Sequence, residues 1–315
     1  MLTVQLAFQL ILFIGLGIFV QRRGIVDGSF DKSLTNLLLD VAVPCLIVKS
    51  FLLPFSLEDL RSCLLLLGLA LLVALLSFLV GQAAYLAAGR GSSARMLRYA
   101  AIFSNFSFVG MPVVEALYGQ KGLFYFVVFL IPMRVLYYTA PAPLLTPPGA
   151  GRARPPLSAR LRAVCSPPMA AVLVGVALYV TRVPLPAVAV SVLSSMGAVC
   201  IPLGMMLCGI SLAKHDMRAF LRPRFLRAPL LRNLLMPALV LGLAALLPLD
   251  ALIAQLLVVY AALPVPSLLV AFTIEYDPAP GSRMESAATV FFSTLLCAAT
   301  VPRWAAAAQA AFPLP

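Results

Sequence analysis

Residues 99–118 read YAAIFSNFSFVGMPVVEALY, an apolar run of the length that crosses a bilayer but with polar residues and a proline near its centre. About 20 residues at 1.5 Å per residue span roughly 30 Å of hydrocarbon. Asn105 and Ser107 are polar where their neighbours are apolar. Proline in mid-span removes a backbone donor and clashes with the preceding turn. We therefore expect Pro112 to interrupt its helix near the bilayer centre, with a simple kink as the alternative.

The rest of the chain has the composition of an integral membrane protein. Of its 315 residues, 62% are hydrophobic and only 11% are charged, whereas soluble domains have roughly 45–50% and about 25%. Apolar stretches that qualify as spans lie near residues 3–20, 34–53, 63–88, 99–118, 122–145, 167–182, 187–213, 229–248, 251–275 and 284–304. The sequence thus predicts an all-α membrane protein with ten transmembrane helices.

The basic residues predict how these spans are oriented. Seventeen Lys and Arg fall in the loops after the odd-numbered spans and four on the opposite side. Because Lys and Arg concentrate in cytoplasmic loops, both termini are predicted to lie outside the cytoplasm, in a multi-pass protein of the cell membrane. The net charge of +12 is then mainly a topology signal, with some attraction to anionic membrane lipids, and it does not indicate nucleic-acid binding.

A hydrophilic stretch divides the spans into two equal sets. Residues 146–166 are rich in Pro, Gly and Arg and form a predicted cytoplasmic linker. Residues 1–145 would be a first five-helix repeat and residues 167–315 a second. Since five is odd, the second copy would be inserted upside down, as in many secondary transporters.

Prolines recur at similar offsets in the two halves. Pro44 and Pro202 are 158 residues apart, and Pro112 and Pro264 are 152 apart. The second pair, together with Pro266, predicts proline-broken crossover helices in the fourth and ninth spans. Freed backbone groups at membrane depth persist where they are buried or line a cavity, and the starts of half-helices favour anions.

The residues at these two breaks form the candidate substrate site. Asn105 could donate to a carboxylate, although hydrogen bonding between helices is an alternative role. The predicted substrate-binding residues are Asn105, Ser107, Gly110, Pro112, Pro264, Pro266 and Arg134.

Ionisable residues inside spans are further candidates. Arg134 lies near the midplane of the fifth span and must face a partner or a cavity, so a structural pair with a carboxylate is the alternative to substrate binding. Asp40 is the candidate partner, or a group that couples transport to a proton or ion. Lys49 and Glu115 lie within about one turn of the outer interface, where snorkelling explains them.

No feature of the sequence predicts covalent or metal chemistry. The six cysteines have no CxxC or paired spacing, and His215 stands alone beside Asp216. We therefore expect no metal site, no cofactor and no enzymatic activity.

The fourth span also resembles a known family. Asn105, Gly110 and Pro112, followed by Tyr118-Gly119, are similar to the Asn-x4-Gly-x-Pro motif and trailing Tyr-Gly of the auxin efflux carrier (PIN-like) family. The short middle loop resembles its compact prokaryotic permeases. The agreement continues through residues 38–51, 201–205, 209–213, 262–264, 275–276 and 293–302.

This resemblance implies a ten-span carrier in which helices 4 and 9 cross at their breaks and hold an organic anion between a scaffold domain and a transport domain. Known cargoes of the family are carboxylates such as auxin, malate or malonate. Asn105, Pro112 and Pro264 match its crossover positions, whereas Arg134 and Lys49 match no family motif.

Our leading hypothesis is a secondary transporter of a small organic acid anion that works by alternating access. Two alternatives use the same fold: a sodium-coupled symporter resembling the bile acid sodium symporter family, and a receptor that binds its ligand without moving it. Besides the anion and membrane lipids, candidate partners are a proton or sodium ion and a second copy of the chain in a homodimer.

Overall fold

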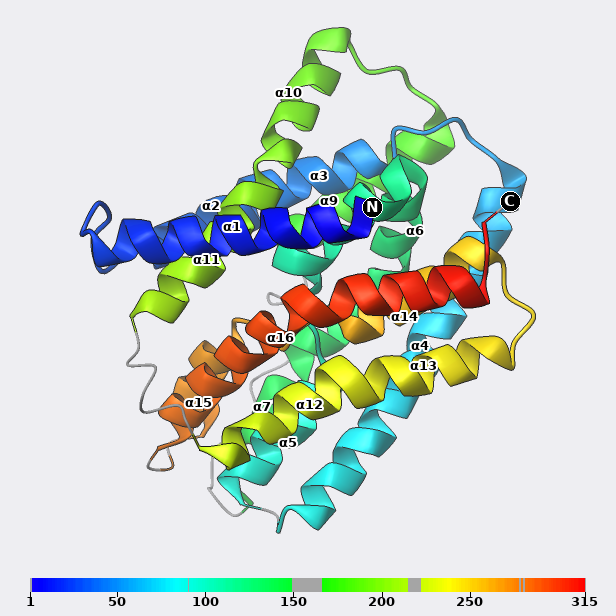
Figure 1. The fold of residues 1–315 in the computed structure, drawn as a ribbon. Helices are drawn as coiled ribbons and strands as arrows, with labels where there is room; N and C mark the ends of the chain where they lie inside the picture. The colour runs from blue at the N-terminus through cyan, green and yellow to red at the C-terminus, as the bar shows by residue number, and fades with distance from the viewer. Residues whose placement is uncertain are drawn as a thin grey trace. The chain divides into compact units, whose positions relative to one another are not determined.

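The computed structural model describes residues 2–89, 91–148, 166–214, 222–277, 279 and 281–314, which form helices and their connections (Figure 1). The longer α-helices are α1 (Leu2–Arg22), α4 (Leu57–Ala87), α5 (Ser92–Ile102), α6 (Met111–Thr139), α9 (Pro167–Thr181), α10 (Ala187–Ala198), α11 (Cys200–Ala213), α13 (Met236–Ala245), α14 (Ala251–Ala262) and α16 (Ser282–Ala311). The shorter ones are α2 (Phe30–Leu37), α3 (Val43–Ser50), α7 (Pro141–Leu145), α12 (Arg227–Leu230) and α15 (Leu269–Tyr276). The π-helices are η1 (Leu38–Ala42), η2 (Phe106–Gly110) and η5 (Leu231–Leu235), and η4 (Pro223–Leu226) is a 3-10 helix.

Six described helical segments are long and apolar enough to cross a membrane, and three shorter apolar helices accompany them. One of the six, Ser92–Thr139, covers the predicted span 99–118 and most of the predicted span 122–145. At Gly119 the backbone has φ 65° and ψ −160°, so α6 is two helices joined at a kink. Glycine suits this position because a side chain there would strain a backbone with positive φ.

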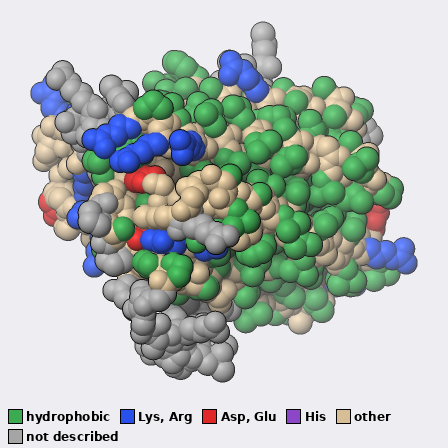
Figure 2. Space-filling view, turned by 90° about the horizontal axis from the view of Figure 1, so that it is seen from below, with side chains coloured by type: hydrophobic (Ala, Val, Ile, Leu, Met, Phe, Trp, Pro, Cys, Tyr) green, Lys and Arg blue, Asp and Glu red, His purple; other side chains and the backbone are tan. Residues whose placement is uncertain are grey.

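Large apolar side chains cover much of the outer surface. On α4, the side chains of Leu71, Leu75 and Leu79 are all more than half exposed. Figure 2 shows hydrophobic side chains over a broad part of one face, with many of the Lys and Arg gathered toward one side of it. An exposed apolar surface of this extent fits contact with lipid rather than with water.

The chain divides into two compact units, each assembled from separated stretches. The first holds the described parts of residues 1–69, 107–131 and 162–214. There α1 and α11 lie side by side (Figure 1). A Cβ added to Gly17 would clash with the Met206 carbonyl, and one added to Gly209 would clash with the Ile14 carbonyl. Small residues therefore let these two helices approach backbone to backbone.

The second unit holds the described parts of residues 70–106, 132–161 and 215–315. In it α14 packs on α13 and α16, and α15 packs on α16 and α7. The residues that form the helix breaks and their surroundings described below come from this unit.

Each of the three π-helices in the described residues ends two residues before a proline: Pro44, Pro112 and Pro237. Proline has no N–H for the carbonyl four residues earlier. A π turn bonds residues five apart, so that carbonyl can pair with the next N–H and the helix continues. Pro112 consequently lies in the first turn of α6, in a continuous helical stretch. The expectation that Pro112 itself breaks the fourth span is wrong, because the non-helical residues are Phe103–Asn105.

Candidate functional site

Two helices of the second unit are interrupted, and the interruptions meet. Helix α5 ends at Ile102, and residues 103–105 are extended before η2 begins. Helix α14 ends at Ala262, and residues 263–268 are non-helical before α15. The backbone N–H of Asn105 donates to the Pro264 carbonyl (2.7 Å), and the side-chain Nδ2 of Asn105 donates to Ser267 Oγ (2.9 Å). The two breaks expected in the fourth and ninth spans are thus joined, with Pro266 in the second of them.

Arg232, on η5, donates hydrogen bonds to the C-terminal carbonyls of both interrupted helices. Its side chain is fully buried. Nε donates to the Leu263 carbonyl (3.1 Å), Nη1 to the Ala101 carbonyl (3.0 Å) and Nη2 to the Tyr260 carbonyl (3.0 Å).

The sequence explains why two of these carbonyls lack their regular helical donor. In a continuous helix the Tyr260 carbonyl would accept from residue 264, but Pro264 has no N–H. The carbonyl accepts instead from the Leu263 N–H (3.3 Å) and from Arg232. The Ala101 carbonyl would accept from the Asn105 N–H, which is turned to Pro264 instead. Arg232 therefore donates to both of the carbonyls that have lost their regular helical donor.

The next residue, Asn233, fixes the second break from another side. Ser293 Oγ, on α16, accepts from the Val265 N–H (2.9 Å) and donates to Asn233 Oδ1 (2.6 Å). The Asn233 carbonyl, which Pro237 deprives of its usual donor, accepts from Trp304 Nε1 (3.0 Å). Asn233 and Ser293 are both fully buried. The π-helix η5 thus aims two consecutive polar side chains at the breaks.

An aromatic cluster packs beside the first break. The Arg134 guanidinium is fully buried, 5.2 Å from the centre of the Phe106 ring. Tyr137 packs edge-on against Phe103 (5.6 Å) and Phe106 (5.3 Å) and also contacts Phe272 of α15 (5.9 Å). Arg134 therefore lies against Phe106, the residue that follows the first break.

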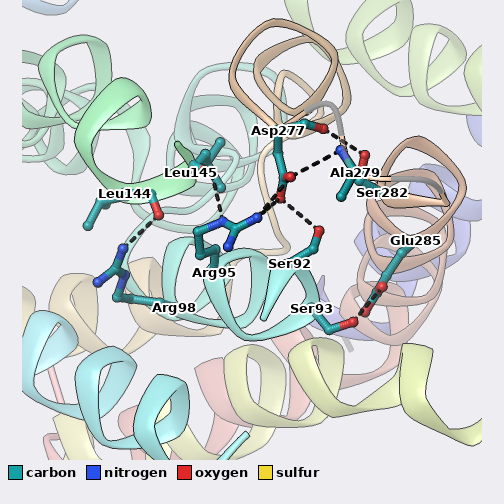
Figure 3. A network of polar contacts seen from close by, with 10 residues as sticks. All are labelled: Ser92, Ser93, Arg95, Arg98, Leu144, Leu145, Asp277, Ala279, Ser282 and Glu285. Atoms are coloured by element: carbon teal, nitrogen blue, oxygen red, sulfur yellow. Dashed lines mark hydrogen bonds and ion pairs between the residues drawn. The ribbon is translucent and has the colours of Figure 1, made fainter. Parts of the chain in front are cut away.

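A charged network holds the far ends of α5 and α15 together (Figure 3). Arg95 Nη2 lies 2.9 and 3.0 Å from the two carboxylate oxygens of Asp277, and Arg95 Nε donates to the Leu145 carbonyl (2.8 Å). Ser92 Oγ donates to the same carboxylate (2.7 Å), and Ser282 Oγ donates to the Asp277 carbonyl (2.8 Å). Both interrupted helices are anchored at the break and again at this end.

Comparison with known proteins decides the family. A family model described as membrane transport protein matches residues 2–305. The chain belongs to this membrane transport protein family. Curated proteins gave no match. The family is that of the PIN-type auxin efflux carriers, so the resemblance noted from the fourth span is confirmed. Together with the apolar helices, membership makes the chain a multi-pass membrane transporter.

The other predicted site residues lie in the first unit of this transporter. Ser107 and Gly110 are in η2, and Pro112 follows in α6. All three are buried. Asp40 lies in η1 with an exposed side chain, which is an unexpected position for a proton-handling group inside a protein.

Lys49 and Glu115 form an ion pair, with Nζ and Oε1 2.7 Å apart and side chains 24% and 20% exposed. They were expected as separate snorkelling residues, and the structure pairs them instead. Gln120 Nε2 adds hydrogen bonds to the carbonyls of Lys49 and Leu52 at 2.9 and 3.0 Å.

The sequence analysis missed the roles of Arg232, Asn233 and Ser267. Arg232 was counted among the basic loop residues, yet it lies inside the predicted span 229–248. An arginine within a span is a signal for a functional or structural site, and applying that rule consistently would have identified it.

Proposed function

We propose that the protein is a secondary transporter of a small organic acid anion and that the joined breaks of the second unit hold the anion. The half-helices that begin at Phe106 and Leu269 present amide ends, each equivalent to about half a positive charge. Asn105 adds a directional side-chain donor beside them. Such a site can select an acid without a permanently bound counter-charge and can still release it.

The single observation that carries this proposal is the position of Arg232. Helix breaks place negative carbonyl ends and positive amide ends close together, and the two would otherwise offset each other. Because Arg232 donates to three of the carbonyls, the amide ends dominate the local potential. An anion is the ligand that this arrangement favours.

The family and the fold support the remaining parts of the proposal. We place the protein in the cell membrane as ten spans in two inverted repeats, residues 1–145 and 167–315, with both termini outside the cytoplasm. The linker 146–166 lies almost entirely outside the described residues. Transport proceeds by alternating access, in which the unit that carries the breaks moves relative to the other.

Counterflow in proteoliposomes tests the function. Vesicles are loaded with unlabelled indole-3-acetate, malate or malonate, diluted into the labelled acid, and compared with protein-free vesicles. We expect saturable accumulation of at least one acid, unchanged when sodium is replaced by potassium. Flux that depends on sodium would favour the symporter, and binding of a labelled acid without flux would favour the receptor.

A further inference from the structure

We infer that Arg232 is a specificity-determining residue that acts as the built-in cation of the helix crossover. In this role it occupies the carbonyls that would otherwise bind a coupling cation and gives the site its preference for carboxylates over uncharged analogues. The inference rests on the proposed function and names the residue that sets its charge selectivity.

The first step is the charge of Arg232 itself. Arginine stays protonated in proteins, so burial does not neutralise it. Its three hydrogen bonds go to backbone carbonyls, and its guanidinium also lies 5.4 Å from the centre of the Tyr260 ring. In the described part of the chain no carboxylate oxygen lies within 4.0 Å of the guanidinium. The buried Arg95 of the same unit, by contrast, has the carboxylate of Asp277 as its counter-charge. Arg232 instead brings a net positive charge to the breaks.

The second step is what the three carbonyls would do without it. Unwound carbonyls and the C-terminal ends of half-helices coordinate coupling cations in transporters with broken helices. The carbonyls of Ala101, Tyr260 and Leu263 belong to this class, because they close the last turns of α5 and α14. Arg232 holds all three through the planar fork of its guanidinium. The crossover therefore has its positive charge in place before the substrate arrives and has no need of sodium.

The third step is where this charge acts. Arg232 donates to carbonyls that shortly precede Asn105 in one break and Pro264 in the other. Asn105 and Pro264 are hydrogen-bonded to one another. A fixed positive charge next to the proposed site raises the affinity for an anion. The affinity for an uncharged analogue stays nearly unchanged. The hydrogen bonds of Arg232 also stabilise the conformation of the breaks. Substitutions can separate this structural effect from the effect of the charge.

The experiment measures how tightly purified variants in detergent bind labelled indole-3-acetate and its uncharged analogue indole-3-acetamide. Each measurement is made in sodium chloride and again in potassium chloride. If counterflow identifies malonate as the substrate, malonate and malonamide replace this pair. Arg232→Gln should weaken binding of the acid at least about tenfold and change amide binding by less than about threefold. Arg98→Gln is the matched control, because Arg98 also donates to a carbonyl, that of Leu144 (2.6 Å), and the substitution should preserve the preference.

A second variant, Arg232→Lys, tests the role of the charge even if Arg232→Gln does not fold. Lysine retains the charge but, unlike arginine, can lose its proton at alkaline pH. Its preference for the acid should match wild type near pH 6 and decline by pH 9, while the wild-type preference stays constant.

The outcomes separate the two proposals. A wild-type protein that binds none of the acids contradicts the proposed function. Wild-type binding that requires sodium, or an undiminished acid preference in Arg232→Gln, overturns the role of Arg232 while leaving anion transport intact.

Discussion

The ion pair between Arg95 and Asp277 offers the sharpest test of how the interrupted helices are held. The two side chains are 6% and 0% exposed, and removing one partner of a buried pair costs about 3–5 kcal/mol. Asp277 retains the hydroxyl of Ser92 in an Arg95→Met variant, so we expect the lower end, a loss of about 3 kcal/mol in the free energy of unfolding. The matched control is Arg283→Met, whose exposed side chain predicts a change within about 0.5 kcal/mol.

The assay is reversible unfolding of the purified protein in mixed micelles, applied to Arg95→Met, Asp277→Asn and the double variant. Because Arg95 contacts both carboxylate oxygens, the double-mutant cycle should give a coupling energy of about 2 kcal/mol. Costs that add without coupling, or an Arg95→Met loss under about 1 kcal/mol, would show that this contact does not hold α5 to α15.

The remaining predictions concern the site and the topology. Asn105→Ala should weaken carboxylate binding about tenfold with a loss of stability near 1 kcal/mol, since the side-chain hydrogen bond to Ser267 is removed; unchanged affinity in a binding titration would place the anion elsewhere. Arg134→Ala should lower the initial rate of counterflow at least about tenfold and Arg134→Lys should restore part of it, because the planar fork of donors is lost; a correctly inserted Ala variant with normal flux would make Arg134 dispensable. A reporter fused at Pro315 should be active only outside the cytoplasm, and activity on the cytoplasmic side alone would reverse the topology.

The sequence predicted the helical class and the family because both depend on features readable locally. Apolar runs of about 20 residues indicate membrane helices, and the spacing of Asn105, Gly110 and Pro112 is a motif in itself. The joined breaks were also within reach, since Asn105 and Pro264 were both assigned to crossover positions. The ten-span count, the inverted repeats and the orientation stay predictions.

Proline was the least reliable guide, because its effect depends on the turn around it. Pro264 lies in a true break, whereas Pro112 and Pro237 are absorbed by π turns. Nothing in the local sequence distinguishes these outcomes, and at both Pro264 and Pro237 a side chain donates to the carbonyl four residues before the proline. That donor is Arg232 at the second break and the Trp304 indole at Asn233, and each comes from a distant part of the chain.

Pairings between distant side chains were likewise invisible in the sequence. Lys49 and Glu115 were each consistent with an interfacial position, and only the packing of α3 against the start of α6 joins them. Arg232 shows the opposite error, because a charge counted as a loop residue is fully buried. A charge count locates loops correctly on average and says nothing about which arginine is structural.

Hydrogen exchange measured by mass spectrometry tests the central claim, that the joined breaks bind the anion, most directly. The protein is labelled with and without a saturating concentration of the carboxylate that exchanges in counterflow, and with its amide as the control. We predict slower exchange in peptides that cover residues 104–109 and 265–270, with little change from the amide. Protection confined to other segments, with these two unchanged, would contradict the account.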